Sequence, residues 1–77
     1  MVRIIFLNKK DNVAFFHCLP EDKEDNSFDI GIDMHDEKIV FNTLNRNNIY
    51  VAHAVWKIFE FYKENNRLLQ EVTSVWV

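Results

Sequence analysis

The segment from Asp29 to Glu37 carries the densest group of side chains that could take part in chemistry. Asp29, Asp33 and His35 are separated by even numbers of residues, so on a β-strand they point to the same side of a sheet. Carboxylate oxygens are the ligands that hard cations such as Ca²⁺ prefer. The segment lacks EF-hand spacing, however, and a solvated strand face followed by an acidic turn at Asp36 and Glu37 explains the same residues. We therefore expect no metal site and no bound cofactor.

A second possible chemistry is nucleophilic catalysis by His17 and Cys18. Adjacent residues of a strand point to opposite faces, so these two side chains do not form a base and nucleophile pair. Cys18 is instead expected to be a small buried hydrophobic residue. The other histidines, His35 and His53, lie far away in sequence, and only the fold could bring them together. The sequence therefore favours a protein that is not an enzyme.

Composition excludes several functional classes. The chain has 77 residues, with nine Lys and Arg against twelve Asp and Glu and a net charge of -3, so it lacks the basic surface of most nucleic-acid-binding proteins. No apolar run approaches the length of about 20 residues that a membrane helix needs. A single cysteine permits no intramolecular disulfide. These features predict a cytoplasmic protein that binds neither nucleic acid nor membranes.

Alternation of apolar and polar residues predicts five strands. The clearest alternation is at residues 27–34, where Phe28, Ile30, Ile32 and Met34 alternate with small or polar residues. Runs of β-branched and aromatic residues between turn-forming residues predict the other four strands, at residues 2–8, 13–19, 38–44 and 68–77.

One helix is expected at residues 49–64. Its apolar face is formed by residues at helical spacing, namely Val51, Val55, Ile58, Phe59 and Tyr62. Asparagines on both sides, within 45–48 and at 65–66, are suited to cap its ends.

The predicted order β-β-β-β-α-β describes a small α+β fold. A chain of this length builds one core, so residues 1–77 are expected to be a single domain. We expect a single-layer sheet of about five strands with the helix packed on one face. The first four strands form a meander, and the last strand returns to the same sheet. If the last strand pairs in parallel with the fourth, the crossover should be right-handed.

One helix covers only one face of a sheet, yet several predicted strands are apolar on both faces. The strand at 2–8 carries Ile5 and Leu7 opposite Ile4 and Phe6. The second and last predicted strands show the same pattern. An apolar surplus of this size predicts a second covering layer supplied from outside the chain.

The predicted interface contains the apolar residues that one helix would leave uncovered: Ile5, Leu7, Phe16, Trp76 and Val77, with Trp56 on the helix as an alternative. The sequence does not determine which face of the sheet meets the helix. Phe6 and Phe15 could therefore take the places of Ile5 and Phe16.

Our leading functional hypothesis is a small protein-interaction domain that binds itself as a homodimer or binds another protein. Its size and acidic charge are typical of inhibitor, immunity or antitoxin-type proteins. The alternative is a small enzyme or ligand-binding protein with a site at a dimer interface. In that case the polar groups would come from the three histidines and from Asp29 and Asp33.

Overall fold

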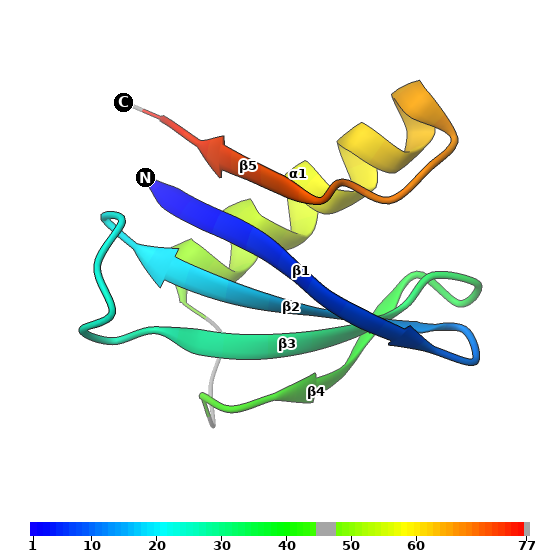
Figure 1. Cartoon of the computed structure of the whole chain (residues 1–77), viewed down its shortest axis with the longest axis horizontal. Coiled ribbons are helices and arrows are strands. Elements are labelled where there is room, and N and C mark those ends of the chain that lie inside the picture. The colour runs from blue at the N-terminus through cyan, green and yellow to red at the C-terminus, as the bar shows by residue number, and fades with distance from the viewer. Residues whose placement is uncertain (45–47, 77) are drawn as a thin grey trace.

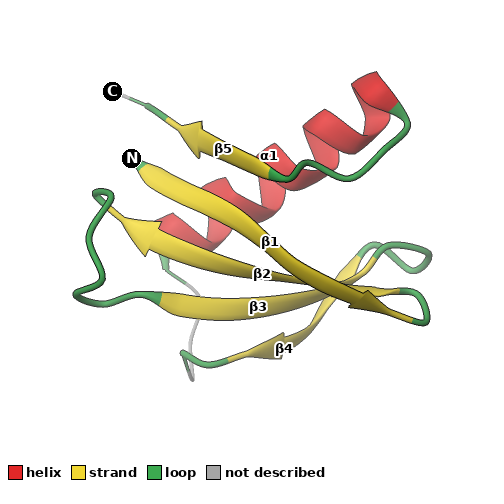
Figure 2. Cartoon of the chain, in the orientation of Figure 1, coloured by secondary structure: helices red, strands yellow, loops and turns green. Residues whose placement is uncertain are grey.

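The computed structural model describes residues 1–44 and 48–76. This part of the chain contains strands β1 (Val2–Lys10), β2 (Val13–Pro20), β3 (Phe28–Asp33) and β4 (Lys38–Asn42), helix α1 (Ile49–Asn65) and strand β5 (Glu71–Ser74). The predicted order β-β-β-β-α-β and the α+β class are thus confirmed. Figures 1 and 2 show one sheet with the helix on one side of it.

The strands form one antiparallel sheet in the order β4-β3-β2-β1-β5. Strands β1 to β4 are the expected meander. The helix carries the chain back across the sheet, so β5 pairs antiparallel with β1 rather than with β4 (Figure 1). A right-handed crossover to parallel pairing with β4, the alternative for the last strand, therefore does not occur.

The pairing register decides which side chains meet the helix. Ile4 lies opposite Cys18, and Phe6 lies opposite Phe16, with their rings edge to face at 5.6 Å between centroids. These residues belong to the helix-covered face. The core contains the buried side chains of this face, of α1 and of the segment before β5: Val2, Ile4, Ala14, Phe16, Cys18, Phe28, Ile30, Ile32, Val51, Ala54, Ile58 and Leu69.

Two irregularities alter the alternation along the strands. The register of β1 against β2 shifts between Phe6 and Asn8, so that Asn8 pairs with Phe15 and Leu7 is the extra residue. The register of β4 against β3 shifts between the pairs that contain Phe41 and Ile39, which makes Val40 the extra residue of that strand. Each bulge leaves an apolar side chain exposed.

Asparagines cap both ends of α1. The side chain of Asn48 accepts a hydrogen bond of 3.0 Å from the backbone N–H of Val51. Asn66 adopts a left-handed conformation with φ 54°, and its N–H donates to the carbonyl oxygen of Tyr62 at 2.8 Å. β5 is shorter than the predicted strand at 68–77, and Leu69 in the segment before it is buried in the core.

Candidate interaction site

The face of the sheet away from α1 is called the open face below. In an antiparallel pair, residues opposite each other share a face, and so do alternate residues of one strand. The register therefore places the following residues on the open face: Arg3, Ile5, Asn8, Lys10, Val13, Phe15, His17, Leu19, Asp29, Gly31, Asp33, Lys38, Phe41, Glu71 and Thr73. Within the described part of the chain, no helix or strand covers this face (Figure 2).

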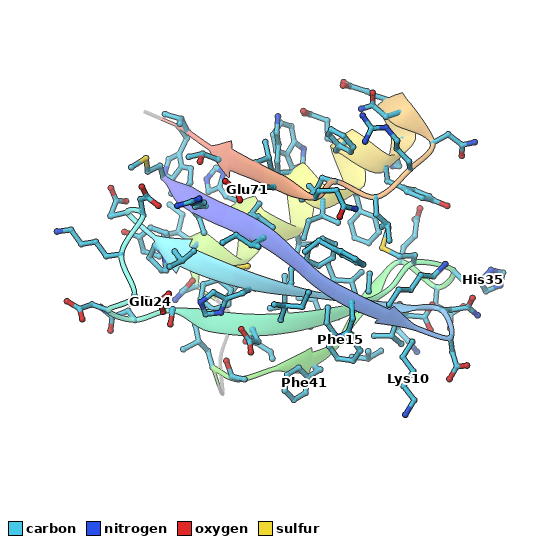
Figure 3. The ribbon with its side chains drawn as sticks, in the orientation of Figure 1. Lys10, Phe15, Glu24, His35, Phe41 and Glu71 are labelled. Carbon is cyan, nitrogen blue, oxygen red and sulfur yellow. The ribbon has the colours of Figure 1, made fainter. Side chains whose placement is uncertain are left out.

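The apolar part of the open face is centred on Gly31. Phe15 and Phe41 flank this glycine on neighbouring strands, and their rings meet edge to face with centroids 6.0 Å apart. A Cβ atom at Gly31 would lie 2.8 Å from the Cε1 atom of Phe15, so only glycine allows the two rings to close over the backbone here. Phe41 remains 47% exposed. We call Ile5, Phe15 and Phe41 the open-face patch. Figure 3 labels Phe15 and Phe41.

The other end of the open face is charged. Arg3 donates to Glu71 at 2.7 Å and to Asp22 at 3.2 Å, and these hydrogen bonds, chiefly that to Glu71, raise the pKa of the guanidinium. Figure 3 shows Glu71 and Glu24 well away from the two phenylalanine rings. Ile5 of the patch lies opposite Glu71 in the register of β1 and β5, so the apolar patch adjoins this surface rich in carboxylates at its Ile5 end.

His17 forms the second polar cluster of this face. Its Nδ1 atom lies 2.6 Å from Asp29 Oδ1, and its Nε2 atom lies 3.4 Å from Glu24 Oε2. The hydrogen bond to Asp29 raises the pKa of the imidazole, and Glu24 adds to the effect, while partial burial opposes it. A protonated His17 can therefore pair with Glu24 in the loop after β2 and with Asp29 on β3, which holds this loop against the sheet.

The structure places the six predicted interface residues at different sites. Ile5 is half-buried on the open face. Leu7 is 47% exposed in the bulge of β1, and Trp56 is 59% exposed on α1. Val77 lies outside the described residues.

Phe16 and Trp76 require correction. Phe16 has no exposed surface, because the register turns it toward α1 and into the core, so it cannot contact a partner. Of the two phenylalanines of β2, Phe15 is the one on the open face, which is the alternative that the sequence allows. Phe6 stays on the helix side with Phe16. Trp76 also packs on the helix side, where its ring stacks on His53 with centroids 3.8 Å apart.

A second apolar surface lies between α1 and β4. The helix packs mainly over β1 and β5, which leaves a groove of about 470 Å³ beside β4. We call this the edge groove; its apolar lining is Ile39, Val51, Val55, Trp56 and Phe59, and Glu37 and Lys63 lie at its rim. The sequence places Val55 and Phe59 on the helix face that meets the sheet. In the structure they pack only partly against the core, and the rest of each side chain lines the groove.

The sequence analysis missed Val40, Phe41 and the edge groove. The signal for Phe41 was present, since Val40 and Phe41 are consecutive apolar residues of a predicted strand. Consecutive apolar residues cannot both point to the core in a regular strand. In the structure both are exposed: Phe41 lies on the open face and Val40 is the extra residue of the bulge.

The residues considered for catalysis do not assemble into one site. His17 and Asp29 meet on the open face, whereas His53 contacts Trp76 on the helix side and His35 is exposed in the turn before β4. Burial raises the pKa of the Cys18 thiol to about 12, so this cysteine does not supply a thiolate nucleophile near neutral pH.

The acidic segment is organised by hydrogen bonds of its own. Asp33 accepts from the backbone N–H groups of His35 and Asp36, each at 2.9 Å, which is the pattern of an aspartate-stabilised turn. Among residues 1–44 and 48–76, no group of three or more His, Cys, Asp or Glu side chains is arranged to hold a metal ion.

Comparison with protein-family models, curated proteins and solved structures finds no match to this chain. Within the described residues, no helix is both long and apolar enough to cross a membrane.

Proposed function

We propose that this chain is a small interaction domain that binds a different protein through the open-face patch. The observation that carries the proposal is the pair of rings, Phe15 and Phe41, which close over Gly31 on a face that no described element covers. Exposed aromatic side chains on a rigid sheet supply much contact area and lose little conformational freedom on binding.

The charges of the open face favour a partner with a basic rim around an apolar centre. Arg3, Lys10 and Lys38 on this face are outnumbered by the acidic residues on or beside it: Asp22, Glu24, Asp29, Asp33 and Glu71. Two copies that met face to face would bring these carboxylates together, and like charges across an interface oppose binding. An inhibitor or immunity-type role, in which an acidic domain covers a basic partner surface, has this chemistry.

Site-specific photocrosslinking in the cells from which the gene comes tests the proposal. Phe15 is replaced by p-benzoylphenylalanine, which keeps an aromatic ring at the centre of the patch. The matched control places the same group at Glu64, an exposed position near the end of α1. We expect a covalent adduct with one partner protein from position 15 and none with that protein from position 64.

A second substitution shows whether the adduct depends on the patch. Ile5→Lys adds a charge beside Phe15 and should abolish the adduct, because a charged residue in the centre of an interface is strongly unfavourable. The open face is not a binding surface if position 15 gives no adduct, or gives only adducts that also form from position 64. The proposal also fails if Ile5→Lys leaves the adduct unchanged while circular dichroism shows the variant to be folded.

A further inference from the structure

The loop between β2 and β3, residues 21–26, joins the strand ends at one side of the sheet (Figure 1). Two of its side chains contact residues of the open face. Asp22 accepts from Arg3 at 3.2 Å, and Glu24 Oε2 lies 3.4 Å from His17 Nε2. These contacts place the loop over the charged end of the open face. We call residues 21–26 the flap.

Leu19 lies between the two points where the flap is attached. It is opposite Arg3 in the register of β1 and β2, and it follows His17 by two residues on the same face of β2. Leu19 is only 6% exposed, whereas Phe41 on the same face is 47% exposed. A leucine on a sheet face without a covering helix would be accessible, so we attribute its burial to the flap.

The flap is attached more firmly at its base than at its tip. At the base, Glu21 accepts from the amino group of Met1 at 2.7 Å and from the hydroxyl of Tyr50 at 3.2 Å. The next residue, Asp22, has the longer of the two carboxylate contacts with Arg3. Exposed ion pairs of this kind each contribute little to stability. Loss of a contact nearer the tip should therefore let the flap hinge at its base.

The contact nearer the tip depends on a proton. His17 Nδ1 lies 2.6 Å from Asp29 Oδ1, so in the neutral ring Nδ1 carries the proton and donates it to this carboxylate. Nε2 then presents a lone pair to Glu24, and the contact between them is repulsive. Only the protonated imidazole donates to both carboxylates at once.

The strand on the other side of His17 offers Glu24 no replacement cation. The residue of β1 opposite His17 is Ile5, which carries no charge. Arg3, the next residue of β1 on this face, already donates to Glu71 and Asp22. The attachment of the flap tip to the sheet therefore follows the charge of His17.

We infer that the flap covers Leu19 while His17 is protonated and lifts when His17 is neutral, so that Leu19 joins the binding surface of the open face. Leu19 is a diagonal neighbour of Ile5 across the β1–β2 pair, which makes it continuous with the open-face patch. Lifting also frees the carboxylate of Glu24 for the basic rim of a partner. The movement depends on this chain alone, whereas its role in binding rests on the function proposed above.

Solvent relaxation enhancement of the leucine methyl groups, measured by NMR with a neutral gadolinium chelate, tests the movement on the full chain without a partner. Between about pH 5.5 and 8.5 we expect the enhancement at Leu19 to rise about twofold or more, with a midpoint above the ordinary histidine pKa of about 6.5. Two leucines serve as internal references. Leu69 is 1% exposed and should stay shielded, and Leu7 is 47% exposed and should stay accessible.

Variants assign the response to the flap contact. His17→Asn should abolish the pH response of Leu19, because asparagine does not titrate. Glu24→Ala should leave Leu19 accessible at every pH, since the tip has lost its attachment. Asp25→Ala is the matched control: it removes an exposed carboxylate of the flap that is not one of the two contacting His17, so the pH response should persist.

The role in binding is tested with the photocrosslinking group at position 15. In cell lysate the adduct yield should be higher at about pH 8 than at about pH 6, and His17→Asn should make the two yields equal. Equal yields with His17 present would overturn the control of binding by the flap.

Two NMR results would overturn the movement itself. One is a Leu19 that stays shielded across the pH range; the other is a pH response that survives in His17→Asn. Neither result bears on whether position 15 captures a partner. Conversely, a position 15 that gives no adduct at either pH contradicts the proposed function, while the response of Leu19 still decides whether the flap moves.

Discussion

Gly31 is the residue on which the open-face patch depends, since Phe15 and Phe41 pack across its backbone. Gly31→Ala should destabilise the fold by about 1 kcal/mol, because the added methyl group overlaps the Phe15 ring. This overpacking outweighs the stabilisation that alanine gives by lowering the conformational entropy of the unfolded chain. Urea unfolding measures this change.

The same substitution in a Phe15→Ala background provides the control. Without the ring, the nearest of the remaining contacts is Phe41 Cβ at 3.1 Å, so the destabilisation by Gly31→Ala should become clearly smaller than in the original chain. The difference between the two backgrounds reports the contact itself. Equal effects in both backgrounds would mean that Phe15 does not pack over Gly31.

His17 gives the stability of the protein a specific pH dependence. Its pKa is raised in the folded state, mainly by the hydrogen bond to Asp29, so the folded protein holds this proton more tightly than the unfolded chain. The resulting stabilisation is complete below the unfolded pKa of about 6.5 and is lost as pH rises through the higher folded pKa. Because His17 is partly exposed, the effect should be about 0.5 kcal/mol.

Urea unfolding between pH 5 and 9 should show the original chain losing this increment on the alkaline side of about 6.5, while His17→Asn does not. His35→Asn, which removes an exposed imidazole outside the cluster, should keep the pH dependence of the original chain. Parallel pH profiles for the original chain and His17→Asn would show that the contact with Asp29 has no effect on stability.

At the scale of elements, α1 illustrates how local residues define a helix. Asn48 begins it through the hydrogen bond to the N–H of Val51, and Asn66 ends it in the left-handed conformation. Between them, the 17 residues of α1 contain no glycine or proline. Local chemistry of this kind is why the predicted helix, at 49–64, is nearly the observed one.

Asn48→Ala should destabilise the protein by about 1 kcal/mol, because the N–H of Val51 loses its acceptor at the start of the helix. Asn48→Asp is the matched control: it retains the acceptor and adds a negative charge to a first turn that has no acidic residue, so stability should be kept or slightly increased. Urea unfolding of both variants checks the pair. Equal losses from alanine and aspartate would contradict a capping role.

At the scale of the whole molecule, one core joins the helix to the sheet, and α1 has both a buried and an exposed side. Ile58 is 1% exposed in that core, whereas Trp56 on the same helix is 59% exposed. Ile58→Ala should therefore cost about 2–5 kcal/mol through lost burial and an unfilled cavity.

Trp56→Ala should change the stability of the monomer by less than about 0.5 kcal/mol, as is usual for exposed positions. Denaturant unfolding at concentrations where the protein is monomeric measures both values. A large loss from Trp56→Ala under those conditions would mean that Trp56 supports the fold of the single chain instead of serving an interface.

The sequence was sufficient for the element order and the helix, because these depend on interactions between residues close in the chain. Alternation at 27–34 and helical spacing at Val51, Val55 and Ile58 are patterns of this local kind. The apolar surplus was also visible, since it is a property of composition and alternation. These features account for the confirmed α+β fold and for the expectation of an interface.

Only the tertiary structure decided where that surplus lies. Alternation defines which residues of one strand share a face, but not which face of the next strand joins them; register and bulges decide this. The pairing of Phe6 with Phe16 buried a residue predicted for the interface and turned Phe15 outward. The return of β5 to β1 drew α1 away from β4 and left the edge groove open. These features depend on contacts between residues far apart in the chain, which local sequence patterns do not encode.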